Sequence, residues 1–269
     1  MTVRVILLLC FYIYALFGSA PLLAKTEGIV QTGLRAGWST APGTYTAAID
    51  IELASGWKTY WRNPGAAGLA PQFDFANSRN LKTIELIWPA PKILGPSDMW
   101  SLGYSGQLVL PMEIKAIDPA QPVELEITAS LGICEDICMP AELSFSGLLL
   151  PENQKRDPKI MAALANIPYS RAEADLKELN CSMRAIEDAV KIDVALSMPS
   201  IGTKEILILE YLRPDHWIVM QRPVRKGESL VSSGLLYSET GHPPEVLMSK
   251  LNVTVIGSDY AVDAGPCAP

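Results

Sequence analysis

The 269-residue sequence lacks the motifs that would point to several common enzyme classes. It has no HExxH zinc motif, no glycine-rich phosphate loop and no pair of carboxylates arranged for hydrolysis. Histidine is scarce, because His216 and His242 are the only two in the chain. Each lies beside turn-forming residues, so we expect both in solvated loops. The sequence favours neither a hydrolase nor a nucleotide-binding enzyme, and we expect no metal or cofactor.

Basic residues are also fewer than acidic residues. The chain has 22 Lys and Arg residues against 29 Asp and Glu residues, which gives a net charge of −7. An acidic chain without a basic tract is a poor candidate for binding nucleic acid or anionic lipid. We therefore expect no nucleic-acid partner. The negative field would favour basic protein partners or simply solubility.

Long hydrophobic runs are absent except at the amino terminus. Arg4 precedes an apolar run over residues 5–17, which is too short for a comfortable membrane span and typical of a signal peptide. We expect cleavage after Ala24, because Pro21 would follow the alternative site directly. No later segment approaches 18 apolar residues, so we expect a soluble protein exported to a bacterial periplasm. Disulfides persist in that compartment.

Cysteine is sparse, and its positions carry the most information. Cys10 would leave with the signal peptide, so four cysteines remain and allow three pairings. Cys134 and Cys138 form a CxxxC pair, which a helical turn or a tight hairpin loop can bring together. Closing this five-residue loop would contribute about 2 kcal/mol, against about 4.6 kcal/mol for the loop of about 87 residues between Cys181 and Cys267. Cys134–Cys138 therefore resembles a disulfide that is made and broken during function. Cys181–Cys267 resembles a structural disulfide. Alternatively, Cys267 near the chain end is a free thiol.

Two carboxylates lie between the paired cysteines. Glu135 and Asp136 would disfavour the thiolate form and raise the pKa of the neighbouring thiols. A poorly stabilised thiolate is a poor leaving group, so the dithiol would be the better electron donor. This pattern favours a reductant over an oxidant. Alternatively, both carboxylates point to solvent and only keep the loop polar.

Hydrophobic alternation predicts an all-β protein. Period-2 patterns cover residues 44–53, 83–88, 107–114, 123–130 and 141–149, then 190–196, 205–212, 216–220, 229–232 and 251–256. Helical spacing is confined to residues 158–167 and 170–179, with Asp157 and Ser170 as N-caps. We expect a signal peptide over 1–24 and an immunoglobulin-like β-sandwich over 25–151. A short helical linker and a second small β domain would fill 152–269.

Two segments are rich in aromatic residues. Residues 93–106 place Met99, Trp100 and Tyr104 on an expected loop, where exposed apolar groups usually cover or bind something. The alternative is a hairpin tip folded onto its own core. Residues 56–68 contain Trp57, Tyr60 and Trp61, which we interpret as core and edge aromatics, and Arg62, which could pair with an internal carboxylate.

Four segments together resemble a known family. GWKTYWRNPGAAG (56–68), IELIWPAPKI (84–93), GYSGQLVLPMEI (103–114) and LGICEDICMPAE (131–142) occur in order. They resemble the amino-terminal periplasmic domain of the DsbD/ScsB family of membrane thiol–disulfide reductases, over about residues 26–150. The resemblance implies an immunoglobulin-like domain in which Cys134 and Cys138 are the redox pair. It also implies a cap loop over residues 93–104, with Met99, Trp100 and Tyr104 as its covering side chains.

The resemblance implies partners as well. The sequence contains neither the multi-helix membrane domain nor the thioredoxin-like domain of the full-length family. We therefore expect a separate membrane electron donor of the DsbD or CcdA type, and thioredoxin-like or disulfide-isomerase proteins as periplasmic substrates. The main hypothesis is a protein-disulfide reductase. The alternatives are a copper(I) module with Cys134, Cys138 and Met139 as soft ligands, and a non-enzymatic adaptor.

Overall fold

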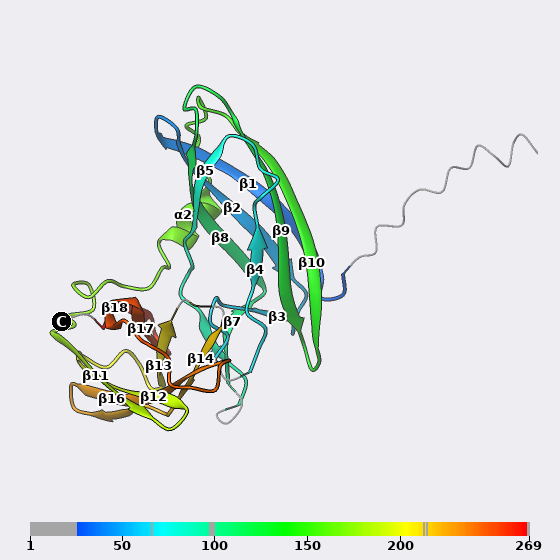
Figure 1. Cartoon of the computed structure of the whole chain (residues 1–269). Helices are drawn as coiled ribbons and strands as arrows, with labels where there is room; N and C mark the ends of the chain where they lie inside the picture. Colours follow the sequence, from blue (N-terminus) through cyan, green and yellow to red (C-terminus); the bar gives the residue numbers. More distant parts are fainter. Residues whose placement is uncertain (1–25, 66, 97–99, 212, 214, 268–269) are drawn as a thin grey trace, which may run out of the picture.

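The computed structural model describes residues 26–65, 67–96, 100–211, 213 and 215–267. The expected signal peptide and Met99 of the expected cap lie outside these residues. The described chain is built mainly from antiparallel strands in four sheets (Figure 1), two in an amino-terminal unit and two in a carboxy-terminal unit. No helix in this described part is long and apolar enough to cross a membrane.

The amino-terminal unit is a sandwich of two sheets. The first contains β1 (Ile29–Ala41), β2 (Thr44–Leu53), β8 (Gln107–Ala116) and β5 (Leu81–Leu86), in that order. The second contains β10 (Cys138–Leu149), β9 (Val123–Cys134), β3 (Lys58–Tyr60), β7 (Ser101–Ser105) and β6 (Lys92–Leu94), with β4 (Gln72–Asp74) also paired to β9. The inner faces of both sheets form one core, in which Ile49, Leu110 and Ile127 are buried. The expected all-β, immunoglobulin-like class is therefore confirmed.

The linker contains one short helix, α2 (Pro158–Leu164), three residues shorter than expected. Asp157 caps it as predicted, because its carboxylate accepts hydrogen bonds from Lys159 N at 2.8 Å and Ile160 N at 3.1 Å. Burial opposes ionisation of Asp157, but the hydrogen bonds from Ile160 N, the Arg35 side chain and Lys159 N outweigh it. Together they hold the pKa of Asp157 below its ordinary value.

The prediction of a second helix over residues 170–179 is wrong. Ser170 and Glu173 do form a helix-start pair, with Ser170 Oγ 2.6 Å from Glu173 Oε2. The chain makes only one helical turn before a helix-end motif ends it. Leu176 N donates to Arg171 O at 2.9 Å, and Asp175 has a left-handed φ of 49°, as at the end of a helix. The chain enters β11 (Glu178–Ile186) soon afterwards.

The carboxy-terminal unit also has two sheets. One contains β11, β12 (Ala189–Ser197), β16 (Ser229–Ser238) and β14 (His216–Met220), with β15 (Val224–Lys226) paired to β16. The other contains β13 (Glu205–Tyr211), β17 (Leu251–Gly257) and β18 (Ala261–Pro266), and the short 3-10 helix η1 (Met248–Lys250) precedes β17. A disulfide joins Cys181 in β11 to Cys267 just after β18, as expected. His216 is not in a solvated loop, because it begins β14 with its side chain largely buried against Asp215 and Tyr211.

The two units share a buried boundary along β13. Because side chains alternate across a strand, Ile206 and Ile208 contact the core of the amino-terminal unit. Leu207 and Leu209 contact the core of the carboxy-terminal unit. One strand of the second unit is thus buried on both faces, which fixes it against the first unit.

Candidate functional site

The Cys134–Cys138 pair closes the hairpin between β9 and β10. The two residues lie opposite each other in the strand register and are joined by a disulfide, with their Cα atoms 4.1 Å apart. Three residues, Glu135 to Ile137, form the loop between them. Of the two geometries that the spacing allowed, the structure has the hairpin.

The two sulfur-bearing residues differ sharply in exposure. Cys134 is fully buried, whereas Cys138 is exposed at the first position of β10. Ile137, directly before Cys138, is 76% exposed. A partner can therefore reach the disulfide from the Cys138 side, while the Cys134 sulfur is enclosed by the protein.

The side chain that encloses the disulfide is Tyr60, at the end of β3. Its hydroxyl lies 2.9 Å from the sulfur of Cys134 and 2.9 Å from that of Cys138. Disulfide sulfurs carry no proton, so the Tyr60 hydroxyl is the donor. Tyr60 is only 3% exposed, and burial raises its pKa above the ordinary value. The phenol therefore keeps its proton as a hydrogen-bond donor.

The Tyr60 ring is held between two backbone segments. A Cβ at Gly132 in β9 would lie 3.0 Å from ring atoms, and one at Gly68 would lie 2.8 Å from them. Leu69 contributes to the same packing, because its Cβ lies 3.0 Å from the same Gly132 position. The absence of side chains at both glycines lets the backbone approach the two sides of the ring.

Tyr104, an expected cap residue, lies on the other face of the sheet. It is paired with Thr59 in the β3–β7 register and belongs to the sandwich core with Ile133. Its hydroxyl donates to Pro89 O at 2.8 Å, and burial raises its pKa well above the ordinary value. Because side chains alternate across strands, Thr59 and Ile133 point away from the face that carries Cys134 and Tyr60. The prediction that Tyr104 covers the disulfide is therefore corrected.

Trp100 contacts the segment behind Tyr60. Its ring lies over Gly65, where a Cβ would be 2.2 Å from it, and Leu102 N donates to Pro64 O at 2.9 Å. Trp100 also lines a cavity of about 370 Å³ between β6–β7 and the carboxy-terminal unit. The expected cap segment therefore supports the chain that follows Tyr60. Met99 lies outside the described residues.

Charges of both signs surround the pair. Glu135 and Asp136 are exposed, and the Glu135 carboxylate lies against Gly56 in the turn before β3. Lys58 lies opposite Cys134 in the β3–β9 register. A cation that projects from the same face of the sheet as Cys134 would favour the thiolate, against the effect of the two carboxylates. The acidic loop is thus only one part of the electrostatic environment.

The third ligand of the copper alternative is badly placed. Met139 lies opposite Ile133, whose side chain belongs to the core, whereas Cys134 and Cys138 lie on the opposite face. Within the residues that the structure describes, no group of three or more His, Cys, Asp or Glu side chains could hold a metal ion. The three ligands of the copper alternative therefore do not project from one face of the sheet.

Two residues matter more in the structure than in the sequence interpretation. The sequence indicates Tyr60 only as a core or edge aromatic of the GWKTYWRNPGAAG segment. Arg62, two residues later, does pair with an internal carboxylate as expected, and the partner is Glu210 in the carboxy-terminal unit.

Comparison with known proteins identifies relatives of the fold and of its amino-terminal part. Among solved structures, the crystal structure of the N-terminal periplasmic domain of ScsB from Proteus mirabilis has the same fold, with a TM-score of 0.62 and 20% sequence identity. The match covers 86% of this chain and 91% of that one. No curated protein sequence matches the chain. Residues 31–150 match the family model of the thiol:disulfide interchange protein DsbD, N-terminal. This part of the chain therefore belongs to the family of DsbD amino-terminal domains.

Proposed function

We propose that the protein is a periplasmic protein-disulfide reductase that passes electrons to partner proteins through Cys134 and Cys138. The observation that carries the proposal is the disulfide itself. One sulfur is open to a partner, the other is buried, and one tyrosine hydroxyl contacts both. A purely structural bond closing so short a loop would add little stability.

The reaction is a two-electron exchange. In the reduced protein, the exposed Cys138 thiolate attacks a disulfide of the partner and forms a mixed disulfide, and the partner's leaving thiolate takes up a proton. The Cys134 thiol then loses its proton and, as the thiolate, attacks the Cys138 sulfur and releases the second partner thiolate, which also takes up a proton. The partner ends as a dithiol and the protein as the Cys134–Cys138 disulfide, so two electrons and two protons have moved to the partner.

Accessibility supports Cys138 as the attacking residue. A sulfur that must meet a partner disulfide in line needs an open approach, which Cys138 has and Cys134 lacks. The Tyr60 hydroxyl can donate to whichever sulfur carries negative charge, since it lies at the same distance from both. Tyr60 would thus stabilise the thiolate at each step.

The partners follow from the reaction and the family. A membrane protein of the DsbD or CcdA type would reduce the disulfide, and thioredoxin-like or disulfide-isomerase proteins would accept the electrons. Both exchanges belong to the periplasm, to which the expected signal peptide would direct the chain.

The test compares single-cysteine variants. Cys134→Ser and Cys138→Ser should each abolish electron transfer to a thioredoxin-like substrate. Cys134→Ser alone should accumulate a mixed disulfide, which mass spectrometry of alkylated protein detects. The matched control is Cys181→Ser with Cys267→Ser, which removes the other disulfide and should leave transfer intact. Full activity in either single variant would exclude the assignment.

A further inference from the structure

We infer that the carboxy-terminal unit positions Tyr60 over the disulfide through the ion pair between Arg62 and Glu210. This inference rests on the proposed function and assigns a role to the second unit. Arg62 and Glu210 are positioning residues, because neither contacts a sulfur. Their effect reaches the site through the three-residue segment from Tyr60 to Arg62.

The first step of the argument is the rigidity of that segment. Trp61, between the two residues, is fully buried and its backbone N–H donates to Leu102 O at 3.0 Å. The guanidinium carbon of Arg62 lies 4.2 Å from the centre of the Trp61 ring, which fits a cation–π contact. A displacement of Arg62 would therefore be transmitted to Tyr60 through two peptide units.

The second step is the strength of the anchor. Arg62 Nε lies 2.9 Å from Glu210 Oε1, and Arg62 Nη2 lies 2.8 Å from Oε2, so the pair is bidentate. The Glu210 side chain is 7% exposed, on the face of β13 that meets the amino-terminal unit. Removing Glu210 leaves the Arg62 guanidinium, whose side chain is 29% exposed, without its carboxylate partner, so Arg62 is no longer held against β13.

The third step is what the anchor prevents. The Tyr60 ring fills a narrow space between Gly68 and Gly132, and the intervening loop is held by Leu102 and Trp100. With Arg62 released, the Tyr60–Arg62 segment has lost its ion pair with the second unit. The ring can then turn away from the sulfurs, which opens the enclosed Cys134 sulfur to small thiols as well as the exposed Cys138 sulfur.

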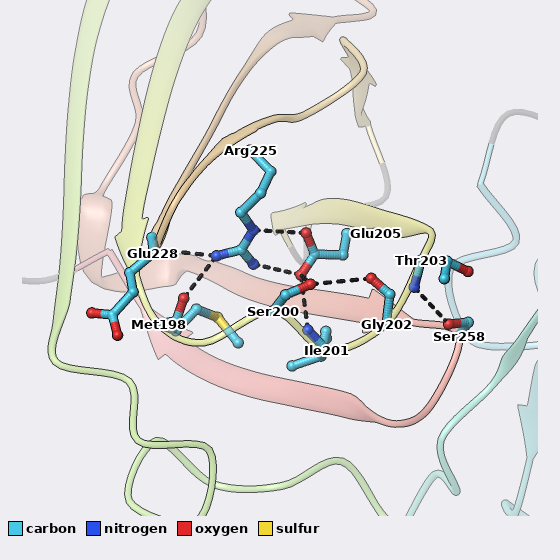
Figure 2. Close-up of polar contacts among 9 residues, drawn as sticks. All are labelled: Met198, Ser200, Ile201, Gly202, Thr203, Glu205, Arg225, Glu228 and Ser258. Carbon is cyan, nitrogen blue, oxygen red and sulfur yellow. Dashed lines mark hydrogen bonds and ion pairs between the residues drawn. The ribbon is translucent and has the colours of Figure 1, made fainter.

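The chain offers a closely matched control on the same strand. Glu205, at the other end of β13, also forms a bidentate pair, with Arg225, and its side chain is 8% exposed. Figure 2 shows that this cluster lies within the carboxy-terminal unit, where Arg225 also donates to the carbonyls of Met198 and Glu228. Glu205→Gln therefore removes a comparable buried charge from a pair formed within the carboxy-terminal unit, which lines the cavity that Trp100 also lines.

The experiment measures the rate at which a small thiol such as dithiothreitol reduces Cys134–Cys138. Glu210→Gln should speed reduction about three-fold or more, whereas Glu205→Gln should leave the rate near that of the wild type. Unfolding temperatures, measured in parallel, should fall in both variants. If Glu210→Gln does not fold, Arg62→Lys gives the same comparison, because lysine keeps the charge but cannot make the bidentate contact.

A double-mutant cycle decides whether the effect passes through Tyr60. Tyr60→Leu removes the ring, so Glu210→Gln should add little further acceleration in that background. Equal rates for Glu210→Gln and Glu205→Gln would overturn the inference. So would the same acceleration by Glu210→Gln with and without the Tyr60 ring. A wild-type disulfide that no thiol reduces would instead overturn the proposed function.

Discussion

Tyr60→Phe isolates the chemical role of the hydroxyl at the disulfide. The substitution removes the donor that lies 2.9 Å from both sulfurs and keeps the ring that Gly68 and Gly132 enclose. We expect the fold to be retained, since no buried donor is left without an acceptor and the ring volume is unchanged. The variant therefore tests charge stabilisation separately from shielding.

The magnitude follows from the change in sulfur charge during exchange. In the oxidised state both sulfurs are neutral, and a neutral hydrogen bond contributes about 1 kcal/mol, whereas a bond to a charged group contributes about 1.5–3 kcal/mol. When a thiol attacks Cys138, the Cys134 sulfur leaves with negative charge. The hydroxyl therefore stabilises the charged leaving sulfur by about 1 kcal/mol more than it stabilises the neutral disulfide. Tyr60→Phe loses this extra stabilisation, which slows reduction about five-fold.

The assay is the reduction rate by a small thiol over a range of pH. Burial raises the pKa of Tyr60, so the hydroxyl stays protonated and the slower rate of Tyr60→Phe should persist from neutral to moderately alkaline pH. Tyr60→Leu should have the opposite sign, because it removes the shield as well as the donor. Equal rates for wild type and Tyr60→Phe would refute the reasoning that the hydroxyl stabilises the leaving sulfur.

Three further predictions concern the rest of the molecule. Cys181→Ser or Cys267→Ser should lower the unfolding temperature, since the long loop is worth up to about 4.6 kcal/mol, while exchange at the other disulfide continues; an unchanged unfolding temperature would contradict this. Trp100→Ala should speed small-thiol reduction modestly by loosening the loop behind Tyr60. Tyr104→Phe should instead lower the free energy of unfolding by about 1 kcal/mol and leave the reduction rate unchanged. A faster reduction rate in Tyr104→Phe would show that Tyr104 covers the disulfide after all. Asp157→Asn keeps the helix cap but loses the charge. The lowered pKa of Asp157 stabilises the fold above the pKa of the unfolded chain and ceases to do so as pH falls through the folded-state value. The variant should therefore be less stable than wild type at neutral pH, and the difference should disappear in acid unfolding measurements at low pH.

The shared boundary of the two units bears on how partners can act. β13 is buried on both faces, and its Glu210 holds a residue two positions from the tyrosine at the disulfide. A partner that binds the carboxy-terminal unit near this strand would therefore lie close to the contacts that join this unit to the one carrying the redox pair. The amino-terminal unit and the carboxy-terminal unit are best tested together, as one chain.

The sequence alone determined the features that depend on local pattern. Period-2 alternation predicted strands such as residues 44–53 and 216–220 with the same bounds as β2 and β14. The CxxxC spacing predicted a locally closed pair, and the polar linker with Asp157 predicted α2. Each of these rests on residues within about ten positions of one another, where side-chain periodicity, turn chemistry and capping act directly.

Only the tertiary structure decided which side chains meet. Tyr60 and Tyr104 are both aromatic and lie on neighbouring strands, yet one contacts the disulfide and the other lies in the core. The difference is a matter of register, because a shift of one residue moves a side chain to the other face of a sheet. The three residues of β3 contain too little pattern to fix that register, which is set by pairing with β7 and β9. The partner of Arg62 is 148 residues away in sequence, and only the packing of β13 against the first unit brings Glu210 to it.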